Sequence, residues 1–185
     1  EKTFDKLGIP LADSTAALSV VRVKGRFEPV FLASRPDTTF IIDYAHTPDA
    51  LENVLKTLRE IAPDRELICL FGCGGDRDKT KRPEMAAIAQ KFADRIIVTA
   101  DNSRTEKTAD IMADIKAGMD ISGKAKSLFI EDREQAIRTA IMLAGQGATI
   151  LLAGKGHEKY QITGKEKTYF DEQAIVAEAF KDIAE

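Results

Sequence analysis

The segment Phe40-Ile41-Ile42-Asp43-Tyr44-Ala45-His46-Thr47-Pro48 leads from an apolar run through a polar loop to a helix start. Consecutive large apolar residues, without alternation, indicate a strand that is buried on both faces. A threonine followed by a proline is typical of a helix start, because the hydroxyl can accept a bond from first-turn amides and proline fits the first helical position. This stretch therefore predicts one strand, loop and helix unit of an α/β domain.

The same unit recurs along the chain. Further apolar runs predict buried strands at residues 67–71, 95–98, 127–130 and 149–153. Stripes with the spacing of one helix face lie among these runs, at residues 51–58, 85–92, 111–119 and 137–144. Asp132 and Asp171 are candidate caps for two later helices. The order βαβαβαβαβ predicts a Rossmann-like three-layer α/β domain, with a mostly parallel sheet and helices on both faces.

Antiparallel additions are expected at the two ends of this pattern. Residues 29–34 predict an antiparallel edge strand, and residues 159–169, with Gly164 at the turn, predict a hairpin before the last helix. Residues 118–124 have the glycine spacing of a P-loop, but Ala125 replaces the hydroxyl residue that would bind Mg²⁺. We therefore expect a helix stop and a turn there.

Length and composition predict one domain that is not embedded in a membrane. The 185 residues suffice for one well-filled core. No apolar run approaches the ~18 residues that span a bilayer, and no signal peptide is recognisable, so the cytoplasm is expected. A net charge of −3 with scattered basic residues gives no field for nucleic acid. Residues 1–23 are expected to be a linker from a preceding domain of a larger enzyme, and residues 24–185 to form the domain.

Polar residues and glycines gather just after four of the predicted strands, in the loops 43–48, 72–79, 101–104 and 154–158. Because the carboxyl ends of parallel strands meet at one sheet edge, these loops predict one site. Arg77 and Arg104 suit a carboxylate or phosphate, since a guanidinium makes two parallel bonds to a planar oxyanion. With Glu158 as the opposite charge and Gly154 allowing close approach, the loops predict a pocket for a zwitterionic amino acid.

A nucleotide is the second ligand that the sequence suggests. Asp43 at a strand end is a candidate acceptor for ribose hydroxyls, and Arg26 on the entering segment is a candidate for meeting phosphates as domains close. The chain has no P-loop, so the nucleotide is expected to be shared with a partner domain. Arg77 occupies the third glycine position of a dinucleotide fingerprint, which argues against a NAD domain. The buried setting expected for Cys69 argues against a metal site.

Five motifs occur in order along the chain: Gly25-Arg26-Phe27-Glu28, Asp43-Tyr44-Ala45-His46-Thr47-Pro48-Asp49, the glycine loop through Arg82-Pro83, Asp101-Asn102-Ser103-Arg104 and Gly154-Lys155-Gly156-His157-Glu158. Together they resemble the carboxyl-terminal domain of the Mur ligases. The resemblance implies an ATP-dependent amide ligase of peptidoglycan synthesis, which adds meso-diaminopimelate to UDP-MurNAc-L-Ala-D-Glu. It also implies ATP and Mg²⁺ held mainly by a central domain, and an N-terminal domain that binds UDP, so this chain alone is expected to be inactive. The resemblance covers the chain from about Lys24 onward.

By matching motif, the resemblance assigns two sets of residues and no metal ligand. The set for diaminopimelate is Arg77, Asp101, Asn102, Arg104, Gly154 and Glu158, and the set for ATP is Arg26, Asp43 and His46. Ser103 stands where the diaminopimelate pattern usually has proline, which implies a less rigid loop. Arg104 is retained. Lysine as a substrate has no distal carboxylate to pair with this arginine. Diaminopimelate is therefore expected in preference to lysine.

Other functions stay open at this point. They are a lysine-adding ligase, a nucleotide-binding Rossmann module of an oxidoreductase, and a non-catalytic binding domain that kept a ligase-like fold. A P-loop upstream of Glu1 would favour the ligase, because such a loop holds the phosphates of ATP.

Overall fold

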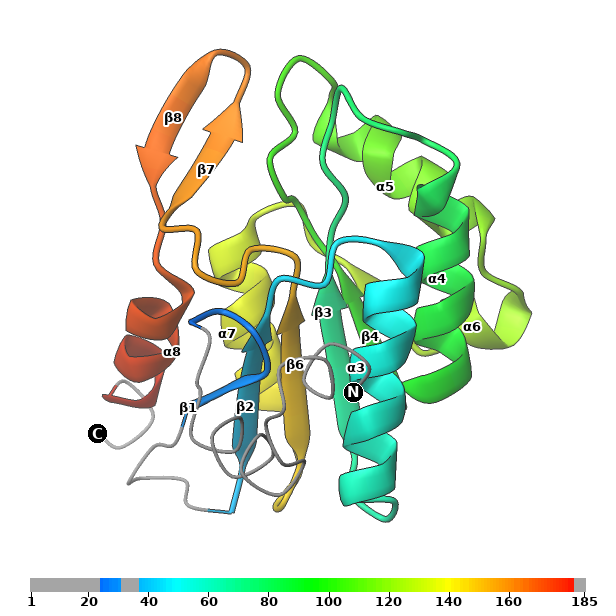
Figure 1. Ribbon diagram of the computed structural model, residues 1–185, viewed down its shortest axis with the longest axis vertical. Coiled ribbons are helices and arrows are strands. Elements are labelled where there is room, and N and C mark those ends of the chain that lie inside the picture. Colours follow the sequence, from blue (N-terminus) through cyan, green and yellow to red (C-terminus); the bar gives the residue numbers. More distant parts are fainter. Residues whose placement is uncertain (1–23, 31–36, 182–185) are drawn as a thin grey trace, which may run out of the picture.

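The computed structural model describes residues 24–30 and 37–181, so the expected linker at residues 1–23 lies outside the described residues. The described strands form one six-stranded sheet and a separate two-stranded hairpin. Figure 1 shows the sheet between two layers of helices, with the hairpin above it. The strands are β1 (Glu28–Val30), β2 (Thr39–Asp43), β3 (Leu67–Phe71), β4 (Arg95–Val98), β5 (Ser127–Phe129), β6 (Thr149–Ala153), β7 (Tyr160–Thr163) and β8 (Glu166–Tyr169). The helices are α3 (Pro48–Ile61), α4 (Lys81–Phe92), α5 (Thr108–Ala117), α6 (Ile121–Ala125), α7 (Arg133–Leu143) and α8 (Glu172–Lys181).

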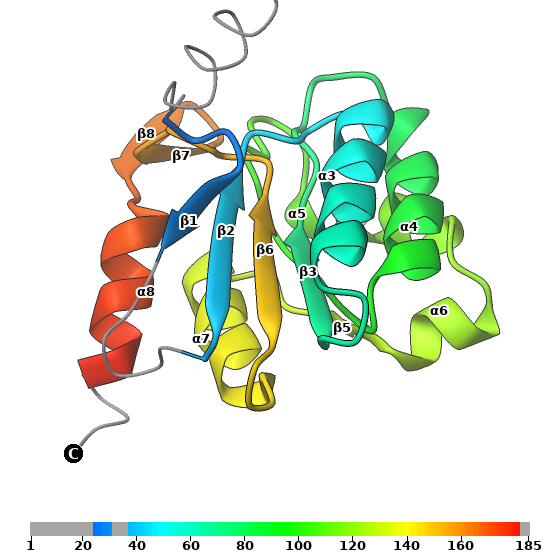
Figure 2. The same cartoon turned by 60° about the horizontal axis from the view of Figure 1, so that its bottom comes forward.

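The continuous apolar runs form strands because both faces of the sheet are covered. Along β3, Leu67, Cys69 and Phe71 pack under α3, α4 and α5, while Ile68 and Leu70 pack under α7 and α8. All five residues of β3 are buried. Figure 2 shows the two helix layers on opposite sides of the sheet. The predicted α/β class, mostly parallel with helices on both faces, is confirmed.

The strand order is β1-β2-β6-β3-β4-β5, and every pair except β1 with β2 is parallel. The last strand of the sheet, β6, therefore lies between β2 and β3. Its Leu151 pairs with Ile41 on one side and with Cys69 on the other. This insertion places the loop that follows β6 between the loops that follow β2 and β3.

The predicted caps and antiparallel additions are confirmed where the structure describes them. The Thr47 hydroxyl accepts a bond from the Ala50 amide, and Asp132 does the same for Gln135. The edge strand is β1, of which residues 28–30 are described, whereas residues 31–34 of the prediction lie outside the described part. The predicted hairpin is β7 and β8 with Gly164 in the turn at a φ of 61°.

The turn expected at residues 118–124 is wrong in part. Residues Ile121–Ala125 form the short helix α6, because the Asp120 carboxylate accepts bonds from the Ser122 hydroxyl and the Gly123 amide. A capping carboxylate offsets the cost of starting a helix there.

Among the described helices, none has both the length and the apolarity needed to cross a bilayer.

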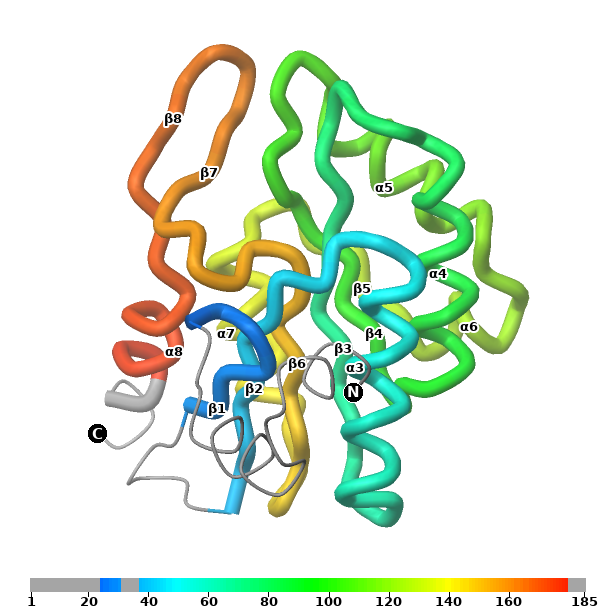
Figure 3. The backbone as a smooth tube through the Cα atoms, in the orientation of Figure 1, coloured from blue at the N-terminus to red at the C-terminus, as the bar shows by residue number. Residues whose placement is uncertain are grey.

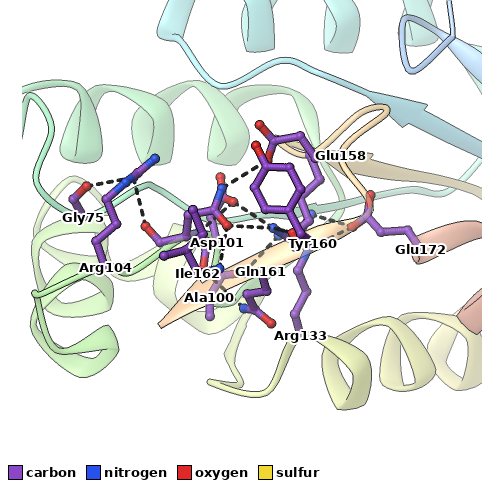
Figure 4. Close-up of polar contacts among 12 residues, drawn as sticks. Gly75, Ala100, Asp101, Arg104, Arg133, Glu158, Tyr160, Gln161, Ile162 and Glu172 are labelled. Atoms are coloured by element: carbon purple, nitrogen blue, oxygen red, sulfur yellow. Dashed lines mark hydrogen bonds and ion pairs between the residues drawn. The ribbon is translucent and has the colours of Figure 1, made fainter. Parts of the chain in front are cut away.

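A buried ion pair joins the strand ends to the last helix. Arg133, at the start of α7, and Glu172, at the start of α8, have side chains that are 0% and 2% exposed. Arg133 Nε donates to Glu172 Oε1 at 2.8 Å, and its two other nitrogens donate to the Ala100 and Ala153 carbonyls. This guanidinium therefore ties the segment after β4 and the end of β6 to α8. Figure 4 shows Arg133 together with Ala100 and Glu172.

Removing one partner of this pair should be costly. Glu172→Ala leaves Arg133 as a buried charge without its counterion, and we expect a loss of about 3–5 kcal/mol in the free energy of unfolding. Urea denaturation measures the loss. The matched control on the same helix is Glu178→Ala, whose side chain is 66% exposed and which should cost less than about 1 kcal/mol. Equal losses in the two variants would contradict this role of the pair.

Candidate functional site

A pocket of about 400 Å³ opens at the carboxyl ends of the parallel strands. Its lining includes His46 and all six residues assigned to the amino acid: Arg77, Asp101, Asn102, Arg104, Gly154 and Glu158. Arg26 and Asp43 lie outside the lining. The lining residues that the sequence did not assign to a ligand are Tyr44, Thr47, Gly74, Asp78 and Lys81. Figure 3 shows how the loops after the strands meet at this edge, below the hairpin.

A hollow of similar volume lies at the opposite edge, by the amino ends of β3, β4 and β5. Its charged groups pair with one another or with the backbone. Arg95 bonds Glu66 at 2.6 Å, and the Lys126 ammonium donates to two backbone carbonyls. The pocket at the carboxyl edge also has paired charges, but its lining includes Arg104, which within the described residues bonds the backbone through only one of its guanidinium nitrogens. It is therefore the better candidate for ligand binding.

A buried lysine underlies the acidic side of the pocket. Lys155 is fully buried and lies 3.3 Å from Asp101 Oδ1. Its ammonium also donates to Asn102 Oδ1 at 3.2 Å and to the Tyr160 carbonyl at 2.8 Å. Burial lowers the pKa of Lys155, and the nearby Asp101 carboxylate opposes this shift. The lysine therefore joins the 101–102 loop to the base of the hairpin.

The carboxylate of Glu158 lies at the pocket wall between two donors. Tyr44 donates its hydroxyl to Oε1 at 3.3 Å, and Asn102 donates its amide to Oε2 at 3.1 Å. Burial, followed by the proximity of Glu158, raises the pKa of Tyr44, so the phenol stays protonated and donates. Figure 4 shows Glu158 beside Asp101 and Tyr160. A partly buried carboxylate held this way suits an ammonium group.

The guanidinium of Arg104 provides the opposite charge. Its Nη1 donates to the carbonyls of Gly75 and Asn102, at 2.9 and 3.2 Å. No other guanidinium nitrogen of Arg104 has a hydrogen bond within the described residues, and Figure 4 shows the remaining nitrogens directed away from these two carbonyls. A Cβ at Gly74 would come within 3.1 Å of Nη1, so the glycine loop leaves room for the guanidinium.

The backbone of Arg104 is held in an unusual conformation. Its φ of 52° lies in the left-handed region, which costs energy for a residue other than glycine. The hairpin offsets this cost, because the Arg104 amide donates to the Ile162 carbonyl at 3.2 Å and the Arg104 carbonyl accepts from Gly164 at 2.6 Å. The preceding Ser103, the departure from the diaminopimelate pattern, is buried, with 2% exposed.

A network around Glu106 supports the glycine loop. The fully buried Arg82 bonds both oxygens of Glu106 and also donates to the Gly74 carbonyl. Glu106 accepts from the Asp76 amide at 2.6 Å as well. These donors hold the pKa of Glu106 at about 2, the Arg82 contact contributing most. The neighbouring Arg77 is exposed, and its side chain bonds the Asp76 carbonyl at the rim of the pocket.

The three residues assigned to ATP gather around Tyr44. The guanidinium of Arg26 lies 4.9 Å from the centre of the Tyr44 ring, and His46 meets that ring edge-on at 4.6 Å. Asp43 is buried, and its Oδ2 accepts from the Phe27 amide at 2.6 Å. The structure therefore brings these three residues together beside the pocket, with only His46 in its lining. In the described part of the chain, no group of three His, Cys, Asp or Glu residues could hold a metal ion.

Geometry and charge together define a class of protein. It is a parallel α/β domain with a polar pocket beyond the strand ends, in which fixed carboxylates and fixed arginines line the same cavity. Such a pocket can bind and orient a small molecule that carries both ammonium and carboxylate groups.

The chain belongs to the Mur ligase family. The family model described as "Mur ligase, glutamate ligase domain" matches residues 25–156. The UDP-N-acetylmuramoyl-L-alanyl-D-glutamate--2,6-diaminopimelate ligase of Thermosynechococcus vestitus is 47% identical over 95% of this chain. The ligase of the same name from Synechococcus elongatus is 51% identical over 96%. The chain spans 35% and 36% of these two relatives, which is about a third of their length.

Solved structures agree with the fold. A structure titled as a UDP-N-acetylmuramoyl-L-alanyl-D-glutamate--2,6-diaminopimelate ligase matches with a TM-score of 0.80 and 38% identity, over 98% of this chain and 36% of that one. The UDP-N-acetylmuramate-alanine ligase of Thermotoga maritima matches with a TM-score of 0.64 over 99% of this chain and 35% of that one, and its 21% identity supports the fold alone. The resemblance seen in the five motifs is therefore confirmed.

Acid should reveal the role of Glu106. Its pKa in the folded protein is about 2, below the ordinary value of 4.5, so its stabilising effect is present above pH 4.5 and is lost as the pH falls toward 2. We expect Glu106→Gln to lower the melting temperature clearly at pH 7. This deficit should shrink between pH 4.5 and 2, as measured by thermal melts across that range. Glu60→Gln, on the exposed side of α3, is the control and should change little. A deficit that does not vary with pH would contradict the assignment.

Proposed function

We propose that this chain is the amino-acid-selecting carboxyl-terminal domain of an ATP-dependent ligase that adds meso-diaminopimelate to UDP-MurNAc-L-Ala-D-Glu in the cytoplasm. Residues 24–185 would form that domain and residues 1–23 the linker to the preceding one. The two relatives that are 47% and 51% identical are named as ligases of 2,6-diaminopimelate, which supports this substrate. The pocket at the strand ends supports the role of this chain in selecting the amino acid.

The observation that carries the proposal is the fixed separation of opposite charges in one pocket. Glu158, held by Tyr44 and Asn102, offers a carboxylate for an ammonium. Arg104, held by two loop carbonyls, offers guanidinium nitrogens for a carboxylate. Meso-diaminopimelate carries an ammonium and a carboxylate at each end, so it can satisfy both walls at once. Lysine lacks the second carboxylate and would leave Arg104 without a partner, which disfavours it.

The role of this chain in the reaction would be to bind and orient the amine. ATP with Mg²⁺ would supply the activation of the acceptor carboxylate, as an acyl phosphate that the amine then attacks with release of phosphate. The walls of the pocket would hold one end of diaminopimelate, so that the amino group at the other end faces the activated carboxylate. Such positioning converts an encounter of two molecules into a reaction within one complex.

The residues around Tyr44 fit a nucleotide at the edge of the pocket. Arg26 is exposed and His46 half-buried, so their side chains are accessible to phosphates or a base. The Asp43 carboxylate already bonds the Phe27 amide, and we propose that it also orders the segment that carries Arg26. This chain would therefore complete a nucleotide site whose main part lies in the central domain.

The substrate assignment predicts a selective effect in the full-length enzyme. Arg104→Ala should raise the KM for diaminopimelate by roughly a hundredfold, because a charge-assisted pair to the substrate is lost, while the KM for ATP changes less than about twofold. Steady-state kinetics with each substrate varied in turn measure both constants. Arg95→Ala, an arginine at the opposite sheet edge, is the control and should change neither. Equal, small effects on the two constants would refute the assignment.

The nucleotide assignment predicts that ATP binding needs the whole enzyme. Calorimetric titration of this chain with ATP and Mg²⁺ should give no measurable heat of binding, whereas the full-length enzyme should bind. In the full-length enzyme, Arg26→Ala should raise the KM for ATP by roughly tenfold, the size of one lost charge-assisted hydrogen bond. Tight binding of ATP by this chain alone would show that the site is not shared.

A further inference from the structure

Asn102 occupies a position where its side-chain amide can point in only one direction. Its Oδ1 lies 3.2 Å from the Lys155 ammonium and 3.0 Å from the Ile162 amide. Both of these groups are donors and neither can accept a bond, so an acceptor oxygen must face them. The Nδ2 group must therefore face the other way, toward Glu158 Oε2 at 3.1 Å.

Lys155 is the charged member of this chain of contacts, and its burial makes the arrangement rigid. It is fully buried, and its polar contacts go to the 101–102 loop and to Tyr160. A buried ammonium cannot turn toward water without leaving the Asp101 carboxylate unpaired, which is costly. The ammonium therefore fixes the side chains of both Asp101 and Asn102, two residues that line the pocket.

We propose that Lys155 is a positioning residue that sets the side-chain amide of Asn102, and through it the Glu158 carboxylate, for the ammonium of the incoming amino acid. The proposal rests on the function proposed above. Lys155 itself does not line the pocket and would not touch the substrate. Its effect passes through Asn102 Nδ2 to one oxygen of Glu158, while Tyr44 holds the other oxygen.

The alternative is that Lys155 only stabilises the fold, by bonding the Tyr160 carbonyl and filling the core. The chain offers a lysine of that kind as a matched control. Lys126 donates to the Gln90 and Ala93 carbonyls, both at 2.7 Å, at the opposite edge of the sheet. Lys126→Met should lower the melting temperature and leave the KM values of the full-length enzyme unchanged.

The test compares Lys155→Met with this control in the full-length enzyme. We expect the KM for diaminopimelate to rise roughly tenfold or more, as for one lost hydrogen bond to a charged group, with the KM for ATP within about twofold of wild type. Lys155→Gln keeps a donor toward Asn102 Oδ1 and should show a smaller rise, and it replaces Lys155→Met if that variant does not fold. A lowered melting temperature with an unchanged KM for diaminopimelate, the pattern of the control, would overturn the proposal.

A second variant tests the contact between Asn102 and Glu158. Asn102→Asp keeps an acceptor for Lys155 and Ile162 but turns an oxygen toward Glu158 Oε2, so repulsion should raise the KM for diaminopimelate by at least roughly tenfold. Combining Asn102→Asp with Glu158→Gln restores a donor and an acceptor, because the new side-chain amide can donate to the new carboxylate. The contact between positions 102 and 158 should therefore return in a crystal structure, while the KM for diaminopimelate stays raised because the carboxylate proposed to bind the ammonium is lost. An unchanged KM in Asn102→Asp would also overturn the proposal.

A readout without turnover separates this inference from the proposed function. A crystal structure of the full-length Lys155→Met enzyme should show the contact between Asn102 and Glu158, 3.1 Å in the wild-type chain, lost or lengthened, and Lys155→Gln should show a smaller lengthening. An unchanged contact would overturn the positioning role, whatever the substrate is. If the wild-type enzyme does not use diaminopimelate, the proposed function fails, and this structural result still decides the role of Lys155.

Discussion

The pairing of β6 with both β2 and β3 is the constraint on which the rest of the structure depends. Because these strands are parallel, their carboxyl ends lie at one edge, and the loop after β6 lies between the loops after β2 and β3. Glu158 thereby meets Tyr44 from the loop after β2 and Asn102 from the loop after β4, the strand next to β3. Residues more than fifty positions apart in sequence form one wall of a pocket for this reason.

Buried charges hold this edge in place, at an energetic cost that packing alone would not incur. Arg133 with Glu172 and Lys155 with Asp101 are both nearly or fully shielded from water. A buried pair of this kind is seldom more stable than apolar side chains of the same size, but breaking it is strongly destabilising. Arg133 also bonds the Ala100 and Ala153 carbonyls, and Lys155 bonds the Tyr160 carbonyl, so the pairs fix the backbone at the ends of the strands. That rigidity is what a pocket needs in order to distinguish ligands by charge.

Much of the fold and part of the site could be predicted from the sequence. Apolar runs such as residues 67–71 marked strands because helices cover both faces of the sheet, and the Thr47-Pro48 pair marked a helix start. The glycines and charges after the strands marked the pocket lining, including Arg77, Arg104 and Glu158. Lys155 was not recognised, since a lysine between two glycines gives no sign that it is buried. Asp43 was expected to meet a nucleotide, and the structure adds a contact that the sequence did not indicate, since the Asp43 carboxylate accepts a bond from the Phe27 amide.

The sequence by itself determined the elements, their order and the residue types available at each strand end, because burial and capping are local and periodic properties. Only the tertiary structure decided which strand lies beside which, and therefore which side chains meet. The position of β6 within the sheet depends on contacts between distant segments, and local patterns do not encode it. The direction of the Asn102 amide is a further case, since it is set by Lys155 and Ile162, both more than fifty residues away. Charge separation in the pocket follows from those long-range contacts.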